Sequence, residues 1–169
     1  MRVNGYIPTL NGGPQFLELL GMLARQTFPL QRCVVIDSGS TDGTVAAAQA
    51  SGCEVIGLGD EGFDHGGTRQ RAIDAFPEAD VYCFLTQDAI PADESTFANL
   101  MQAFADPDVG MAYGRQLPHR EATLLERHAR LFNYPAHSQL RALADAPTYG
   151  IKTISCSNSF AAYRREALA

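Results

Sequence analysis

Short apolar runs alternate with helical patterns along the first half of the chain. Residues 3–8, 33–36, 54–56 and 81–85 predict strands, and each run ends in a turn rich in Gly, Asn, Asp or Ser. The segments between them predict helices, as in residues 16–23, where the apolar positions recur at i, i+3, i+4 and i+7. Strands that alternate with helices predict an α/β fold with a mostly parallel central sheet and right-handed crossovers.

The second half of the chain is less regular. A helix is predicted over residues 97–104, a strand over 109–113, a helix over 121–132 and a last strand over 154–163, with weak helical content near 140–144. No repeat, low-complexity tract or linker interrupts this order. Residues 1–169 are therefore predicted to form a single domain.

Composition narrows the class of protein. The chain has 169 residues, 46% of them hydrophobic, and a formal net charge of −6, which leaves no basic field for nucleic acid or an acidic membrane. It contains no apolar run long enough to cross a membrane and no secretory signal at its start. The four cysteines are widely spaced, which favours a reducing compartment and predicts a cytoplasmic protein.

Candidate chemistry gathers just after the predicted strands. Parallel sheets bind ligands at the carboxyl ends of their strands, and residues 8–11, 37–40 and 86–88 supply small polar and acidic groups there. Turns alone also favour these residue types, so one such loop proves little. Their joint occurrence predicts a polar cleft at this edge of the sheet.

Two glycine-rich segments follow the third strand. The first, Gly57–Gly62, matches G-x-G-x-x-G, but Asp60 and Glu61 would repel a pyrophosphate, and we interpret it as a connector. The second, residues 66–71, places two glycines and Arg69 at the start of a helix, a combination that suits a diphosphate. A capped surface helix with solvated arginines is the alternative.

A single acidic residue follows the fourth strand. Asp88 could hold Mg²⁺ or Mn²⁺ between its carboxylate and the phosphate oxygens of a substrate. Its alternative role is to cap the turn before Pro91.

Eight segments together resemble the family-2 inverting glycosyltransferases, and among them bacterial rhamnosyltransferases. The resemblance spans the chain in order and implies a GT-A fold, a nucleotide-binding α/β sandwich. The segments are IPTLNGG (7–13), VVIDSGSTDGT (34–44), FDHGGTRQRA (63–72), FLTQDAIPAD (84–93), YGRQLP (113–118), FNYP (132–135), YGIKT (149–153) and SNSFAAYRREAL (157–168).

The resemblance implies a role for each matching residue. It implies that the nucleoside-diphosphate group is bound by Pro8, Thr9, Asn11, Asp37, Ser38 and Arg69. Within that set Asp37 would bond the base and Arg69 would face the diphosphate. Asp88 corresponds to the second aspartate of a D-x-D metal signature whose first position here is Thr86. The donor sugar and acceptor side would be lined by Gln87, Arg115, Asn158 and Tyr163.

The implied reaction transfers a sugar, rhamnose as the best guess, from a dTDP or UDP donor to a glycan or lipid-linked acceptor with inversion. It serves bacterial surface polysaccharide synthesis, at the inner face of the cytoplasmic membrane where the acceptor is lipid-linked. The resemblance places the catalytic base beyond Ala169, so the chain is expected to hold the donor-binding part of a longer domain.

Two alternatives remain open on the residues themselves. A sugar-phosphate nucleotidyltransferase also uses a Gly-rich loop with arginine, but directly after its first strand. A non-catalytic nucleotide-binding module is the other, because Thr86 replaces an aspartate and no base is identified.

Overall fold

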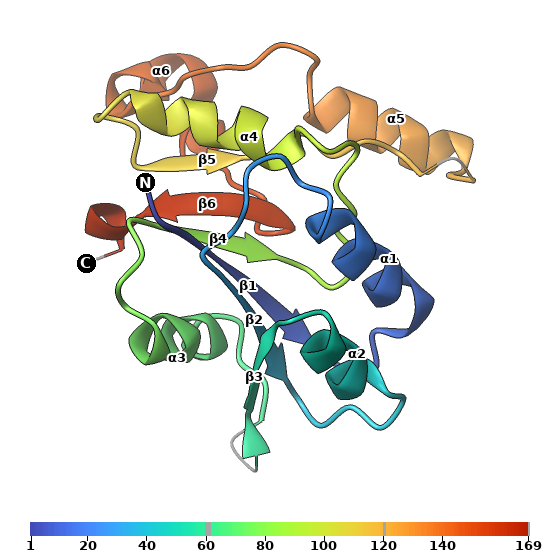
Figure 1. Cartoon of the computed structure of the whole chain (residues 1–169). Coiled ribbons are helices and arrows are strands. Elements are labelled where there is room, and N and C mark those ends of the chain that lie inside the picture. The colour runs from blue at the N-terminus through green and yellow to red at the C-terminus, as the bar shows by residue number, and fades with distance from the viewer. Residues whose placement is uncertain (60–61, 120, 169) are drawn as a thin grey trace. The chain divides into compact units, whose positions relative to one another are not determined.

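The computed structural model of the chain describes residues 1–59, 62–119 and 121–168 (Figure 1). It divides into two compact units, one formed by Met1–Tyr113 with Asn158–Ala169 and the other by Gly114–Ser157. Asp60 and Glu61, on which the interpretation of the Gly57–Gly62 segment depends, lie outside the described residues.

The first unit is built on a mixed sheet of order β3-β2-β1-β4-β6-β5. Its strands are β1 Val3–Thr9, β2 Arg32–Asp37, β3 Glu54–Gly57, β4 Val81–Leu85, β5 Met111–Tyr113 and β6 Phe160–Arg164. The first four strands are mutually parallel, which confirms the predicted α/β architecture. The sixth strand runs antiparallel between β4 and β5. All six strands can be followed in Figure 1.

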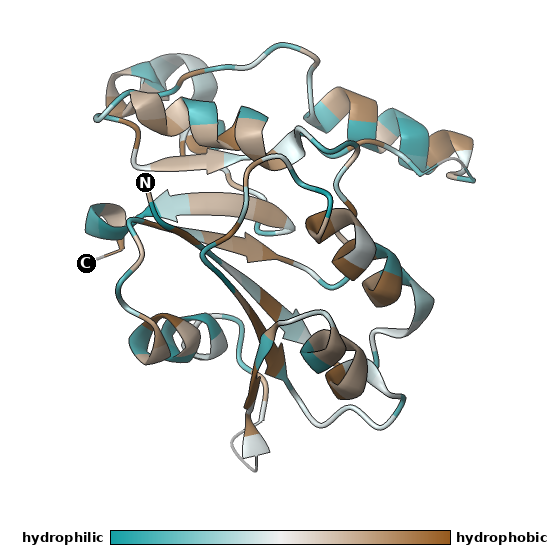
Figure 2. Ribbon diagram, viewed as in Figure 1, coloured by the Kyte–Doolittle hydropathy of each residue, from teal (hydrophilic) through white to brown (hydrophobic). Residues whose placement is uncertain are grey.

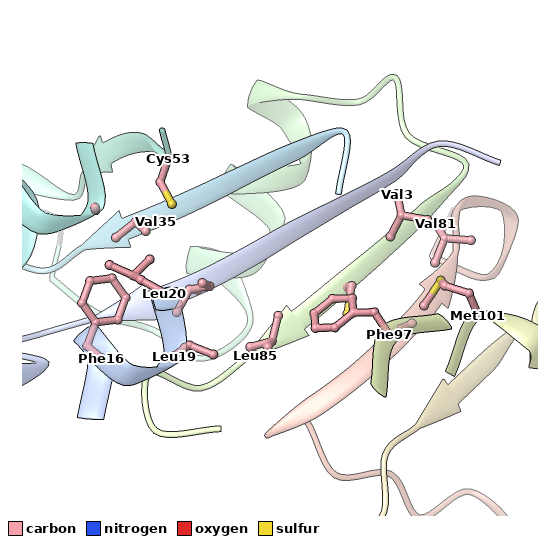
Figure 3. Packing of buried hydrophobic residues seen from close by; sticks show 14 of the residues in the cluster. Val3, Phe16, Leu19, Leu20, Val35, Cys53, Val81, Leu85, Phe97 and Met101 are labelled. Carbon is pink, nitrogen blue, oxygen red and sulfur yellow. The ribbon is translucent and has the colours of Figure 1, made fainter. Parts of the chain in front are cut away.

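Helices cover both faces of this sheet. They are α1 Gly13–Leu23, α2 Thr44–Ala50, α3 Gly67–Ala75 and α4 Thr96–Met101. The side chains of a strand point alternately to its two faces, so Val81, Cys83 and Leu85 pack with α1, α2 and α4, whereas Tyr82 and Phe84 pack with α3. Figure 3 shows the first of these two cores.

A small polar network lies on the α3 face of the sheet. Tyr6 is fully buried, accepts a hydrogen bond from Asn4 Nδ2 and donates one to the Phe76 carbonyl, both at 3.2 Å. Burial of the phenol raises the pKa of Tyr6 to about 12. The network joins β1 to the end of α3, and thereby sets the position of that helix against the sheet.

The second unit is mostly helical and irregular. Its longest element is α5 Leu124–Asn133, followed by the short helix α6 Ala146–Tyr149. The predicted helix began at residue 121, but the structure starts it at Leu124 because Thr123 and Glu126 form a reciprocal capping box. None of the residues of α5 is buried, and apolar and polar residues alternate along its ribbon in Figure 2.

The prediction of a strand over 154–163 is wrong for its first six residues. The N–H groups of Ile154 and Ser155 donate to the carbonyls of Ile151 and Lys152, which continues the preceding 3-10 turn. β6 begins only at Phe160, opposite Leu85 of β4. The predicted strand at 109 similarly begins later, at Met111, because Val109 closes a turn onto Asp106.

Candidate functional site

The carboxyl ends of the parallel strands lie at one edge of the sheet. Thr9, the last residue of β1, stands opposite Asp37 of β2, and Asp37 stands opposite Gly57 of β3. The segment 86–88 follows β4, the other neighbour of β1. The sequence-predicted residues at these strand ends are therefore brought to the same edge; they are Pro8, Thr9, Asn11, Asp37, Ser38, Gln87 and Asp88.

The loop between β1 and α1 is fixed by side chains from the neighbouring loops. Its four consecutive N–H groups donate to Gln87 Oε1 (from Leu10, 2.9 Å), Ser40 Oγ (from Asn11, 2.8 Å), Thr44 Oγ1 (from Gly12, 2.9 Å) and Asp42 Oδ2 (from Gly13, 3.1 Å). Asn11 adopts a left-handed backbone conformation with φ of 47°, which few residues other than glycine and asparagine tolerate. The edge of the sheet is thus organised before any ligand arrives.

Asp42 and Thr44 at the start of α2 act as a pair in this arrangement. The Thr44 hydroxyl and N–H both donate to Asp42 Oδ1. These bonds, led by the hydroxyl, hold the pKa of Asp42 below its usual value, so the residue remains a carboxylate that can accept the Gly13 amide. The sequence reasoning assigned neither residue a role, although an aspartate that accepts the N–H two residues further on is typical of an Asx turn.

The side-chain amide of Gln87 makes two hydrogen bonds to the backbone of Leu10. Gln87 Oε1 accepts from the Leu10 N–H at 2.9 Å, and Gln87 Nε2 donates to the Leu10 carbonyl at 3.3 Å. The resemblance gives Gln87 a contact with the donor sugar. In the structure, its side chain ties the end of β4 to the end of β1.

Asp37 has one carboxylate oxygen committed and one without a partner. Oδ2 accepts the N–H groups of Gly39 and Ser40, each at 2.9 Å, which closes the turn after β2. Oδ1 is buried and accepts no hydrogen bond from any residue that the structure describes. A buried acceptor without a donor is costly, so this oxygen is a candidate contact for a ligand N–H group.

Arg69 on α3 presents the complementary group, a half-buried cation. Its Nη1 donates to the His65 carbonyl at 2.5 Å, and its guanidinium lies over the Phe84 ring, 5.7 Å from the centroid. Its Nε is buried and has no acceptor among the described residues. Burial lowers the pKa of Arg69, and the nearby Tyr163 opposes that shift.

The start of α3 differs from the anion site that its two glycines predicted. The Gly67 N–H donates to the carboxylate of Asp64, so this amide is already satisfied. A Cβ at Gly67 would lie 2.5 Å from Asp64 Oδ2, so the close approach of this carboxylate to the backbone requires a glycine here. The aspartate three residues before Gly67 could have indicated this local side-chain-to-backbone bond. Arg69, and not the helix terminus, is the candidate partner of an anion here.

Asn158 and Tyr163 of the last segment adjoin the same region of the first unit. The Tyr163 hydroxyl donates to Asn158 Oδ1, and the Tyr163 ring meets Phe84 edge-on at 5.9 Å between centroids. The Thr86 N–H donates to the carbonyl of Ser159 at 3.1 Å. Tyr163 and Arg69 therefore share Phe84 as a neighbour, a residue that the sequence reasoning did not select.

Asp88 is exposed and its carboxylate accepts no hydrogen bond within the described residues. The turn after β4 is closed instead by the backbone, where the Ala89 N–H donates to the Thr86 carbonyl at 3.0 Å. The capping alternative is therefore not what the structure shows. No cluster of three or more acidic, His or Cys groups suited to a metal exists in the described part of the chain. A single free carboxylate fits an ion that takes its other ligands from substrate phosphates and water.

Arg115 belongs to the second unit. Its Nε donates to the Tyr134 carbonyl at 3.0 Å, and the side chain is exposed. Within the described residues, no helix combines the length and the apolar character that crossing a membrane requires.

The fold and this edge define a class. The chain shares its fold with solved structures of glycosyltransferases. One is the mannosyltransferase PcManGT of Pyrobaculum calidifontis in complex with GDP-Man and Mn²⁺, with a TM-score of 0.64. Another, also with a TM-score of 0.64, is the glucosyl-3-phosphoglycerate synthase of Mycobacterium tuberculosis in complex with Mn²⁺, UDP and glucosyl-3-phosphoglycerate. Each covers 98% of this chain, at 20% and 21% identity; the chain covers 45% and 57% of them. At that identity the likeness shows the fold.

The sequence comparisons identify the family. The profile of glycosyl transferase family 2 matches residues 6–169, and the chain belongs to this family. It is 44% identical over 166 residues to the O-antigen chain rhamnosyltransferase RfbN of Salmonella typhimurium and 39% identical over 160 residues to WbaN of Salmonella anatum. These alignments cover 98% and 94% of this chain but 53% and 51% of the relatives, so the chain spans about half their length. The resemblance drawn from the motifs is confirmed.

Proposed function

We propose that this chain binds the nucleoside-diphosphate sugar in an inverting glycosyl transfer, with rhamnose as the sugar, during synthesis of a bacterial surface polysaccharide. One observation carries the proposal. Counting partners among the described residues, the first unit holds a buried carboxylate oxygen without a donor, on Asp37, and a buried guanidinium nitrogen without an acceptor, on Arg69. A nucleoside diphosphate offers an N–H group to the first and an anion to the second. The rhamnose assignment is supported by the names of the two relatives.

The nucleoside is assigned to the ends of β1 and β2. Asp37 Oδ1 accepts the imide N–H of a uracil or thymine base, while its Oδ2 keeps the turn closed. Pro8, Thr9, Asn11 and Ser38, at the same two strand ends, are assigned to the surroundings of the base. Because the β1–α1 loop is already bonded, little conformational entropy is lost when the base binds.

The diphosphate is assigned to Arg69 and Asp88. The guanidinium offers its unpaired Nε to the phosphate oxygens. Asp88 would hold Mg²⁺ or Mn²⁺, which supplies positive charge to stabilise the leaving diphosphate. With Thr86 in place of a second carboxylate, the ion would take most of its ligands from the phosphates and water, so metal and nucleotide binding are expected to be coupled.

The reaction is a direct displacement. The acceptor hydroxyl oxygen attacks the anomeric carbon, the bond from that carbon to the diphosphate oxygen breaks, and its electron pair leaves with the nucleoside diphosphate. Inversion follows from attack opposite the leaving group. The acceptor proton passes to a carboxylate base, a role that we assign to no residue of this chain. Gln87 and Arg115 are assigned to the donor sugar, and Asn158 and Tyr163 to the acceptor side.

We further propose that this domain works in the cytoplasm on a glycan or lipid-linked acceptor. We also propose that both units belong to one donor-binding domain over residues 1–169. Support comes from the family profile, which runs through both units without a break.

The proposal is tested by calorimetric titration of the chain with dTDP and UDP, each with and without Mn²⁺. Binding that Mn²⁺ strengthens supports it, and absence of binding to both nucleotides contradicts it. Because the catalytic base is assigned to no residue of this chain, full release of dTDP from dTDP-rhamnose and an acceptor glycan is expected only from a longer version assayed beside it. Accumulation of a nucleotide sugar from a sugar phosphate would instead support the nucleotidyltransferase alternative.

A further inference from the structure

The second unit exposes an unusual amount of apolar surface. Fifteen large hydrophobic side chains are exposed in the described part of the chain, and ten of them belong to Gly114–Ser157. These ten are Leu117, Leu124, Leu125, Leu131, Phe132, Leu140, Leu143, Tyr149, Ile151 and Ile154. Isolated exposed leucines are common in proteins, but such a concentration in one short stretch indicates an interaction surface.

The helix α5 gives this surface an ordered face. At 100° per residue, one continuous side of α5 holds Leu131, Leu124, His128, Phe132 and Leu125. Arg127 borders this side next to Leu131, and Arg130 lies on the opposite side. Leu124, Leu125 and Phe132 are 88%, 79% and 71% exposed. The capping box at Thr123 holds the start of the helix, and none of its residues is buried.

Charge is distributed unevenly along the chain. Residues 114–157 contain six Arg and Lys and three Asp and Glu, a formal charge of +3, within a chain whose total is −6. Three of the four histidines lie there as well. Among the Arg and Lys residues of this unit, Lys152 places its ammonium group 5.8 Å from the centroid of the Phe132 ring, beside the apolar side of α5.

We propose that the α5 face, defined as Leu124, Leu125, His128, Leu131 and Phe132, docks on a membrane surface that carries anionic phospholipids. An amphipathic helix with cations and large apolar side chains lies in the plane of such an interface, where the apolar side enters the acyl boundary and the cations meet the headgroups. The acidic net charge of the whole chain predicted no attraction to an acidic membrane, but it conceals this basic unit.

Charge also argues against two other occupants of this face. A second copy of the chain would bring two units of charge +3 together, which like-charge repulsion opposes. An acidic, polar partner would satisfy the cations but would leave the leucines and Phe132 in water. The combination of both features fits an anionic lipid surface.

The experiment is co-sedimentation of the whole chain with two kinds of vesicle, phosphatidylcholine alone and phosphatidylcholine with about a third of phosphatidylglycerol. The double variant Leu125→Ser, Phe132→Ser is compared with the control Leu17→Ser. Leu17 is 55% exposed on α1 of the acidic unit, so its substitution removes a similar exposed leucine elsewhere.

We expect the chain to bind the anionic vesicles, the double variant to bind them about tenfold less tightly, and the control to bind as the wild type does. Binding should also weaken as salt is raised. Three results would overturn the proposal: no binding by the wild type, equal binding by the double variant, or a self-association that the double variant abolishes. A thermal midpoint that falls by several degrees in the double variant would overturn it too, because the face would then be packed within the protein.

Discussion

The substitution Asp37→Asn separates a role in the turn after β2 from a role in ligand binding. The asparagine Oδ1 can replace Asp37 Oδ2 and accept the N–H groups of Gly39 and Ser40. Its amide nitrogen then takes the place of the unpaired Oδ1, so a donor faces the imide N–H of a bound base. The fold is retained while the proposed contact is reversed.

A hydrogen bond to a charged acceptor contributes about 2 kcal/mol, so the affinity for UDP or dTDP should fall about 30-fold. CDP, whose ring nitrogen accepts a hydrogen bond, should lose less, and the ratio of UDP to CDP affinity should fall in the variant. The thermal midpoint should move by no more than about 2–4 °C. The assay is calorimetric titration with each nucleotide in the presence of Mn²⁺.

The matched control is Asp106→Asn, which alters a carboxylate that also accepts the N–H two residues further on, from Asp108. It should leave all three affinities unchanged. If Asp37→Asn binds UDP within about threefold of the wild type, and the preference for UDP over CDP is kept, the assignment of Asp37 to the base is refuted.

Three further predictions concern Arg69 and Asp88 of the site and the buried Tyr6. Arg69→Lys should lower the affinity for UDP about tenfold and leave the affinity for uridine unchanged, because only the diphosphate contacts the planar guanidinium. Equal losses of affinity for both ligands in calorimetry would contradict the assignment. Asp88→Asn should remove most of the Mn²⁺-dependent gain in UDP affinity, measured by titrations with Mn²⁺ and with EDTA, and a variant that keeps the full gain would exclude Asp88 as a ligand. In the folded chain the pKa of Tyr6 is raised from 10.0 to about 12, so the stability that its neutral phenol contributes is lost as the pH rises through that window. The difference in denaturant stability between wild type and Tyr6→Phe should shrink from pH 10 to pH 12, and a constant difference would show that Tyr6 does not titrate differently on folding.

Sequence patterns predicted the parallel part of the sheet because those strands are buried on both faces. Residues such as Val34, Val35 and Ile36 must be apolar on either side of the sheet, which leaves a continuous run that is easily recognised. Their polar ends follow from the same topology, so Thr9, Asp37 and Asp88 could be selected before the structure was known.

The pattern failed where local bonding outweighs hydropathy. Ile154 looks like a strand residue, yet its N–H closes a turn onto Ile151. Gly67 looks like part of an open anion site, but the carboxylate of Asp64 occupies its amide. In both places the partner lies three residues earlier in the chain, so the information is local but depends on backbone geometry that hydropathy does not report.

The site was only partly predictable for a similar reason. The strand ends identify its edge, whereas the bonds that organise it join Gln87 to Leu10 and Asp42 to Gly13, across gaps of 77 and 29 residues. Such pairs depend on which strands are neighbours, and the strand order is a property of the folded sheet.

In the proposed function, a nucleoside diphosphate binds along the carboxyl edge of β1, β2 and β4. A crystal structure of the chain with UDP and Mn²⁺ tests it most directly. We expect the base to lie against Asp37 Oδ1 and the diphosphate to lie between Arg69 and an ion held by Asp88. Nucleotide bound elsewhere on the chain, with Asp37 Oδ1 and Arg69 Nε still without partners, would contradict it.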